Sequence, residues 1–164
     1  MIKRRLLIAL IAITGLTAVT HLHAASNSEV AYPTGYREWT HVKSTLISPN
    51  APTFRRSSGL HHVYANEKAM EGYRTGQFAD GSVIVFDLLE VKENDGITTE
   101  GARRFIDVME KDSKRFAATG GWGFEEFKGD SQTERALTAQ AQTACYNCHL
   151  QKKERGFVFS VYRQ

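Results

Sequence analysis

Two cysteines and a histidine near the C-terminal end of the chain are the residues best suited to chemistry. Cys145, Cys148 and His149 form the motif Cys-x-x-Cys-His. This spacing is typical of covalent c-type haem attachment. On one helical turn, two thiolates can reach the two vinyl groups of one haem, and the next residue puts an imidazole under the iron. We therefore expect one haem c, held by Cys145 and Cys148, with His149 as the iron ligand.

Two other functions of such a cysteine pair have to be weighed. A structural zinc site would need further Cys or His ligands, but the chain has only two cysteines, and His61 and His62 are adjacent in a segment that reads as a strand. A thioredoxin-like dithiol should lie early in a βαβ unit, whereas Cys145 and Cys148 lie close to the C-terminus. Haem attachment fits the motif best.

The ligand on the other side of the iron decides between haem functions. Electron-transfer cytochromes usually supply Met or His there. No Met follows His149, which excludes the layout of small class I cytochromes c, with the haem motif first and Met near the end. Met70, Met109 and one of His61 and His62 remain as candidates, although each also fits an ordinary core or surface position.

The rest of the chain predicts a mixture of strands and helices that must position this motif. In the clearest strand, alternation puts Ile84, Phe86 and Leu88 on one face. Residues 103–111 fit either a helix or a strand. Elsewhere the patterns predict helices over residues 36–46, 67–74 and 134–142, strands over 60–65, 82–91, 122–127 and 157–162, and turns at 80–81 and 94–96.

Composition and charge exclude several classes of protein. Of the 164 residues, 41% are hydrophobic and 24% are charged, which is globular rather than disordered, fibrous or multi-span membrane composition. The net charge of +3 comes from three cations at the N-terminus, Lys3, Arg4 and Arg5. Without them the charge is zero, so we expect no nucleic-acid partner, because such proteins keep a basic footprint.

The first 25 residues have the form of a secretory signal peptide. Three cations precede an apolar run over residues 6–19, which is short for a membrane span, and Ala24 and Ala25 supply small residues at the cleavage point. We expect residues 26–164 to be the mature haem domain, in the periplasm and with no membrane attachment after cleavage. An uncleaved N-terminal anchor is the alternative, and it also puts the domain outside the cytoplasm.

Several separated segments resemble the cytochrome P-460 family and, within it, the cytochromes c′-β. They are residues 35–39, 62–64, 75–83, 111–116 and 121–122, followed by the haem motif. The resemblance implies an α+β fold, an antiparallel β-sheet with flanking helices and not a four-helix bundle. It also implies that residues 103–111 form a strand and that the protein is a homodimer.

One departure from the family pattern bears on function. Cytochromes P-460 oxidise hydroxylamine with a haem cross-linked to a lysine, but Phe86 occupies that position here. His61 falls where these enzymes carry a pocket Arg. Lys92, six residues after Phe86, reads as a solvated strand end rather than a replacement for the cross-linking lysine. The resemblance therefore implies the c′-β type, with a five-coordinate haem under an apolar, Phe-capped distal pocket.

These observations lead us to expect a gas-binding cytochrome. An apolar pocket offers no hydrogen bond to a bound ligand, which favours nitric oxide and carbon monoxide over oxygen. Phe54 is a candidate second pocket aromatic, and Lys152, Lys153 or Arg155 a candidate proximal hydrogen-bond donor. The alternatives are an oxidoreductase acting on hydroxylamine or nitric oxide, and an electron-transfer cytochrome. An electron-transfer partner is expected in addition to the gas.

Overall fold

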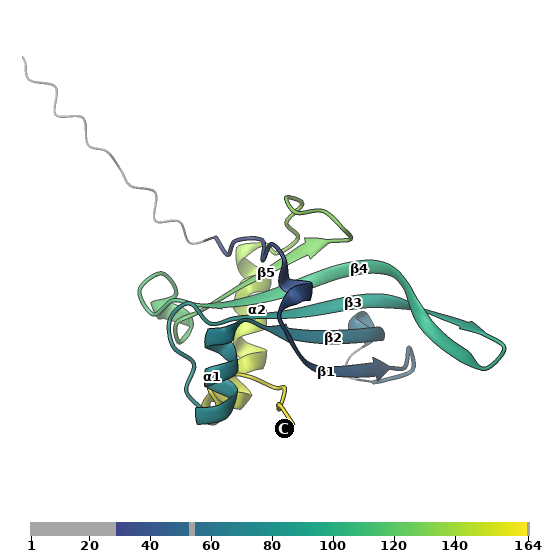
Figure 1. The fold of residues 1–164 in the computed structure, drawn as a ribbon. Coiled ribbons are helices and arrows are strands. Elements are labelled where there is room, and N and C mark those ends of the chain that lie inside the picture. Colours follow the sequence, from purple (N-terminus) through teal and green to yellow (C-terminus); the bar gives the residue numbers. More distant parts are fainter. Residues whose placement is uncertain (1–28, 53–54, 164) are drawn as a thin grey trace, which may run out of the picture.

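A five-stranded antiparallel sheet forms the centre of the computed structural model, which describes residues 29–52 and 55–163 (Figure 1). The predicted signal peptide and Phe54 lie outside these residues. The strands follow one another across the sheet in chain order: β1 (Thr40–Ile47), β2 (Gly59–Ala65), β3 (Val83–Asn94), β4 (Ile97–Lys111) and β5 (Trp122–Lys128). The expected α+β fold, with a sheet and flanking helices rather than a helical bundle, is confirmed.

Within the described residues, two α-helices and four short 3-10 helices accompany the sheet. Helix α1 (Glu67–Thr75) begins at its N-cap Asn66, whose side chain accepts a hydrogen bond from the backbone N–H of Ala69, and ends at Gly76, which has a φ of 78°. Glycine is favoured at such a position because it adopts this left-handed backbone conformation without strain. The others are α2 (Ala139–His149), η1 (Tyr36–Glu38), η2 (Arg55–Ser57), η3 (Ala117–Thr119) and η4 (Leu150–Arg155).

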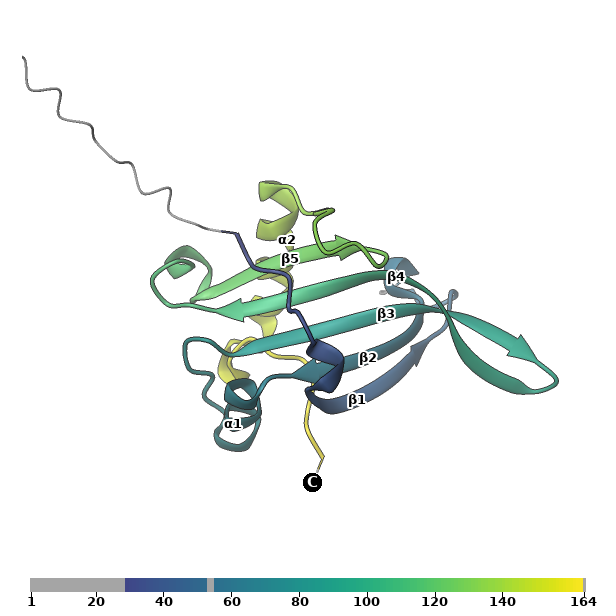
Figure 2. The ribbon, with the colours of Figure 1, turned by 45° about the horizontal axis from the view of Figure 1, so that its top comes forward.

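The two faces of the sheet carry separate apolar clusters. On the side of α2, Ile84, Met109 and Phe124 belong to one cluster, and these residues oppose one another in the strand register. On the other side, Val85 and Phe127 pack in a second cluster with the N-terminal segment. Figure 2 shows this segment and η1 crossing the face opposite α2. The sheet is therefore covered on both faces.

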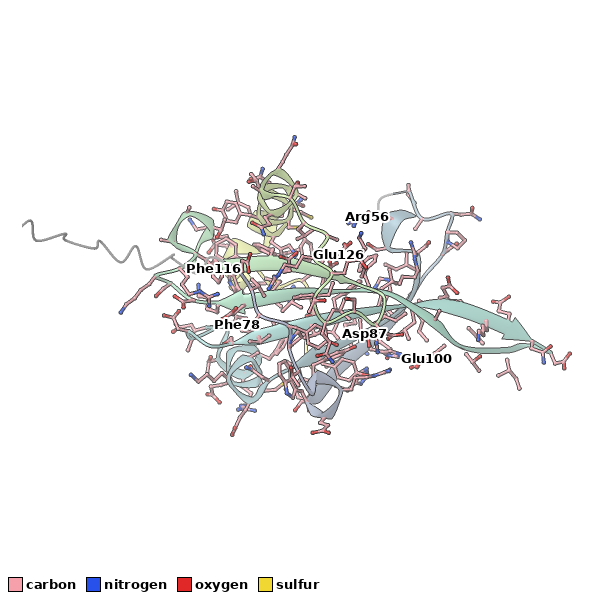
Figure 3. The ribbon with its side chains drawn as sticks, turned by 90° about the horizontal axis from the view of Figure 1, so that it is seen from above. Arg56, Phe78, Asp87, Glu100, Phe116 and Glu126 are labelled. Carbon is pink, nitrogen blue, oxygen red and sulfur yellow. The ribbon has the colours of Figure 1, made fainter. Side chains whose placement is uncertain are left out.

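Residues 103–111, which fitted either a helix or a strand, lie in β4. Alternation puts Phe105, Asp107 and Met109 on the α2 side, and the register pairs Asp107 with Phe86 of β3 and Glu126 of β5. In Figure 3, Arg56 and Glu126 lie on the α2 side, and Asp87 lies on the side of η1.

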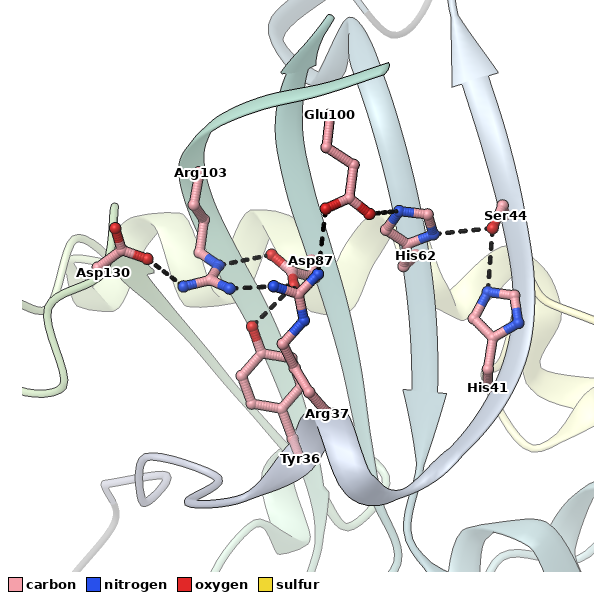
Figure 4. Close-up of polar contacts among 9 residues, drawn as sticks. All are labelled: Tyr36, Arg37, His41, Ser44, His62, Asp87, Glu100, Arg103 and Asp130. Atoms are coloured by element: carbon pink, nitrogen blue, oxygen red, sulfur yellow. Dashed lines mark hydrogen bonds and ion pairs between the residues drawn. The ribbon is translucent and has the colours of Figure 1, made fainter. Parts of the chain in front are cut away.

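A buried carboxylate ties the N-terminal segment to the sheet. Asp87 of β3 is fully buried and accepts hydrogen bonds from the Tyr36 hydroxyl at 2.8 Å and from Nε of Arg103 at 2.8 Å. Burial, followed by the hydrogen bond to Asp87, raises the pKa of Tyr36 far above its ordinary value. Arg37 joins this group to Glu100 and His62 (Figure 4). The network fixes η1 against strands β2, β3 and β4.

Strands β3 and β4 continue past the rest of the sheet as a two-stranded arm, residues 90–100, which protrudes on the right in Figure 1. The register of the pair shifts at Leu89, where the arm begins. The tip is Asp95-Gly96, and the neighbouring Ile97 is 65% exposed. Four carboxylates and one lysine lie on the arm, namely Glu90, Glu93, Asp95, Glu100 and Lys92.

The helix predicted over residues 36–46 is wrong. Only Tyr36–Glu38 turns, as a 3-10 helix, and β1 follows from Thr40. The apolar spacing of Tyr36, Trp39 and Leu46 suggested a helix, but pairing with β2 over the length of β1 overrides this local pattern. His41, predicted on that helix, is exposed on β1 and bonds to Ser44.

Two predictions near the C-terminus also need correction. The helix predicted from residue 134 begins at Ala139 with Thr138 as N-cap, because Arg135 and Ala136 bond to β5 instead. The strand predicted over residues 157–162 is absent from the described part of the chain. This segment turns at Phe157, which has a φ of 68°, and then runs beside the sheet without joining its ladder.

Candidate haem site

A cavity of about 340 Å³ lies between the sheet and α2. Its wall is mostly apolar and combines residues from all five strands with the cysteine motif and the C-terminal segment. The main contributors are Lys43, Thr45, His61, Val63, Ile84, Phe86, Asp107, Met109, Phe124, Cys145, Cys148, His149, Val158 and Phe159. The fold thus brings together all five residues that the sequence analysis put in the site: Cys145, Cys148, His149, Phe86 and His61.

His149 is held with one ring nitrogen already engaged. Its Nδ1 donates a hydrogen bond to the backbone carbonyl of Phe157 at 2.7 Å, which leaves Nε2 as the nitrogen that can bind a metal. The ring packs against Phe124 and Phe159, with centroid distances of 5.1 and 5.0 Å. Burial lowers the pKa of His149, so the imidazole is kept in the neutral form that metal binding requires.

The acceptor of that hydrogen bond lies in an uncommon backbone conformation. Phe157 has a φ of 68°, which is rare for a bulky residue and costs about 1–3 kcal/mol. Its surroundings enforce this conformation: its N–H donates to the carbonyl of Lys152 at 2.8 Å, and the carbonyl of Gly156 accepts from Nε1 of Trp122 at 3.0 Å. The turn at Phe157 aims its carbonyl at His149.

The two cysteines lie at the cavity on successive turns of the same helix face. Both are free thiols. Burial, with a smaller contribution from the charge of Asp107, raises the pKa of Cys145 to about 11, whereas Cys148 is exposed. No residue of α2 is fully buried, and Cys145 and His149 are half-buried where the helix faces the cavity.

Phe86 projects from β3 into the cavity and is supported by His61. The two rings meet edge to face with a centroid distance of 4.2 Å. His61 is almost fully buried, and its Nε2 donates to the carbonyl of Ser57 at 2.5 Å. Burial lowers the pKa of His61. The neutral imidazole of His61 therefore binds η2 through the Ser57 carbonyl and packs against Phe86.

The sequence analysis missed a carboxyl group on this wall, that of Asp107, and its carboxyl partner Glu126 on the next strand. Asp107 lies beside Phe86 across the β3–β4 ladder, and Glu126 is its neighbour on β5. Burial, then the charge of Glu126, raises the pKa of Asp107 to about 8, and a hydrogen bond between the two side chains adds to the effect. Arg56 donates to Glu126 at 2.6 Å. The sequence did contain a signal for this site: Asp107 lies between the apolar residues Phe105 and Met109 on one strand face.

The raised pKa of Asp107 predicts a pH-dependent stability. Between the ordinary carboxyl pKa near 4 and about 8, folded Asp107 keeps a proton that the unfolded chain releases. The free energy of unfolding should therefore decrease as the pH rises through this window. Urea denaturation of the haem-loaded protein across it should show this slope, and Asp107→Asn should reduce it. An unchanged slope in Asp107→Asn would assign it to other groups.

Most of the other residues that the sequence analysis considered for the site lie outside the cavity. Met109 lines the cavity, whereas Met70, on α1, belongs to the same apolar cluster but does not line the cavity. Lys152, Lys153 and Arg155 belong to η4 and do not line the cavity. Lys92 lies on the arm, away from the site. Within residues 29–52 and 55–163, no three or more His, Cys, Asp or Glu side chains are grouped to hold a metal ion.

Comparison with known families supplies the decisive observation. A model described as Cytochrome P460 matches residues 33–160, which is most of the chain and includes the whole cavity wall. The chain belongs to the cytochrome P460 family. Among curated proteins, no match is found. Membership of the cytochrome P460 family makes the protein a haem cytochrome and confirms the family resemblance deduced from the sequence.

The residues of this cytochrome P460 family member fit haem. His149 offers one free imidazole nitrogen, both cysteines lie at the same cavity, and most of the wall is apolar, as a porphyrin requires. Among the described residues that line the cavity, Lys43 is the only Lys or Arg, and it offers a counter-charge for propionate groups. In the part of the chain that the structure describes, no helix is long and apolar enough to cross a membrane.

Proposed function

We propose that this protein is a mono-haem c-type cytochrome that binds nitric oxide or carbon monoxide. Cys145 and Cys148 would hold the cofactor by thioether bonds, and His149 would be the protein ligand to iron. The observation that carries the proposal is the aromatic ring of Phe86 on the wall of the cavity that also contains His149. A phenyl ring can neither coordinate iron nor form the lysine cross-link of the cytochromes P-460.

The bound haem would supply an iron with one open coordination position for the gas. Phe86 would act by its volume and by excluding water. His61 would keep Phe86 in place by edge-to-face packing, and Phe157 would keep the imidazole of His149 oriented through its carbonyl. Asp107 shares a hydrogen bond with Glu126, so its proton is retained within the carboxyl pair. Preference for nitric oxide and carbon monoxide over oxygen follows from this apolar cap.

Covalent attachment gives the first test. Acid–organic extraction of the denatured protein should leave the haem on the polypeptide, because thioether bonds survive unfolding. The intact mass should equal the mature chain plus one haem. The double variant Cys145→Ala/Cys148→Ala is the control and should release any haem it binds. Haem extracted from the unmodified protein, or a tryptic haem peptide that also contains Lys92, would contradict the proposed attachment.

Met109 favours a second candidate function, electron transfer by a six-coordinate haem. Its thioether lines the cavity, and Met is a common axial ligand of electron-transfer cytochromes. The optical spectrum of the reduced protein separates the two functions. A five-coordinate spectrum that changes on addition of carbon monoxide supports gas binding. A six-coordinate spectrum that Met109→Ala converts to five-coordinate supports the second function.

Export and assembly complete the proposal. We propose that residues 1–25 direct the chain to the periplasm and that the mature domain, residues 26–164, forms a homodimer. The basic and apolar pattern of the N-terminus supports export, and a c-type haem is attached outside the cytoplasm. The mass of the purified protein and its sedimentation coefficient test the cleavage and the dimer separately.

A further inference from the structure

The C-terminal segment joins the expected iron ligand to the molecular surface. The ring of Phe159 meets the ring of His149 edge to face, with a centroid distance of 5.0 Å, and Phe159 is 39% exposed. The ring lines the candidate haem cavity and contacts both His149 and Lys152, and Lys152 does not line the cavity. Leu150 and Val161 of the same C-terminal segment are also exposed, so apolar side chains gather on this part of the surface.

One cation lies against this ring, and further cations lie in the same segment of the chain. The Nζ of Lys152 lies 5.3 Å from the centroid of Phe159, and Arg155 donates to the carbonyl of Ser160. Residues 150–163 contain four cations, Lys152, Lys153, Arg155 and Arg163, and one carboxylate, Glu154, so their net charge is +3. The chain after residue 25 is neutral as a whole. The basic charge is therefore concentrated next to the expected haem ligand.

We propose that Phe159 and the surrounding cations, Lys152, Lys153 and Arg155, form the docking surface for an acidic one-electron redox protein. This inference rests on the proposed haem at His149 and names the partner surface of that site. The cations select and orient a negatively charged partner, and Phe159 provides the packed contact between the surface and His149. One electron passes in each encounter: the iron is oxidised and the centre in the partner reduced, or the reverse.

Small redox probes of opposite charge test the sign of this surface directly. Hexacyanoferrate(III) is anionic and would oxidise the reduced protein while being reduced to hexacyanoferrate(II). Its rate constant should fall as the ionic strength rises, because salt screens attraction between opposite charges. Hexaammineruthenium(III), a cationic oxidant, should show the opposite salt dependence. If the rate constants of both probes are independent of salt, the docking surface is not basic and the proposal is wrong.

Charge reversal locates the surface. Lys152→Glu/Lys153→Glu should lower the rate constant with hexacyanoferrate(III) about tenfold or more, which is the scale of electrostatic steering. Lys92→Glu/Lys114→Glu changes the net charge equally at exposed positions elsewhere and should change the rate constant less than about twofold. Reduction potentials are measured for each protein so that rates are compared at equal driving force. Equal effects of the two double variants would overturn the proposal.

The role of Phe159 needs its own variant. Phe159→Leu keeps an apolar side chain against His149 but removes the aromatic ring, and it should slow both probes by a similar factor. Unchanged rates with both probes would remove Phe159 from the electron route.

Sedimentation tests whether a second copy of the chain occupies this surface instead. If Lys152→Glu/Lys153→Glu leaves the rates unchanged and dissociates a dimer, the surface binds a second copy and the proposal fails. Carbon monoxide binding reports separately on the proposed function.

Discussion

Replacing Phe86 by alanine is expected to speed carbon monoxide binding to the reduced protein by about tenfold, which corresponds to about 1.4 kcal/mol of activation barrier. Phe86 lies on the wall of the cavity that contains His149. An incoming ligand must displace the ring or wait for it to move, and alanine removes that obstacle. Stopped-flow mixing of the reduced protein with carbon monoxide measures the effect.

A control separates gating from loss of packing. Phe127 is fully buried in the apolar cluster on the opposite face of the sheet, so Phe127→Leu should lower stability without changing the binding rate. Phe86→Leu is the matched change in the cavity, and it should give a rate between those of the wild type and Phe86→Ala. Equal rate constants for folded wild type and Phe86→Ala would show that Phe86 is not part of the ligand path, and would remove the main support for a gas-binding cytochrome.

Replacing Asp87 by alanine should lower the free energy of unfolding by about 3–5 kcal/mol, the usual cost of removing one partner from a buried ion pair. Asp87 is fully buried and accepts from Tyr36 and Arg103. Without the carboxylate, the Tyr36 hydroxyl and the Arg103 guanidinium lose their acceptor inside the structure. Urea denaturation with the haem attached measures the loss.

Asp130 provides the matched control for Asp87. It also forms an ion pair with Arg103, but its side chain is 81% exposed, so Asp130→Ala should cost less than about 1 kcal/mol. Asp87→Asn should fall between the two, because an amide oxygen can still accept from Tyr36. A cost for Asp87→Ala as small as that for Asp130→Ala would mean that the network is not what holds η1 on the sheet.

The parts of the fold that sequence analysis predicted correctly have strong local signals. Strand β3 has an apolar, β-branched run, and helix α1 has Asn66 and Gly76 at its ends, as the structure confirms. The errors occur where long-range pairing decides. Residues 40–47 form a strand because β2 pairs with them. Residues 103–111 could be assigned to a strand only from the family resemblance, because the apolar pattern around Phe105 fits both the helix period and the strand period.

The candidate site was predictable in part for similar physical reasons. The motif of Cys145, Cys148 and His149 is a local signal, and Phe86 was assigned through its place in the family pattern. Asp107 and Glu126 were missed because their importance depends on burial next to one another, which only the β4–β5 register creates. The strand predicted at Phe157 failed because its left-handed conformation is imposed by contacts with Lys152 and Trp122.

The arm formed by β3 and β4 also bears on solubility. Its two strands pair only with each other over residues 90–100, so each has an outer edge whose backbone groups could pair with another chain. Open edges of this kind promote aggregation, and charged side chains oppose it. Glu90, Glu93, Asp95 and Glu100 give the arm an excess of negative charge. Two arms therefore repel one another, which keeps these edges from joining into a continuous intermolecular sheet at high protein concentration.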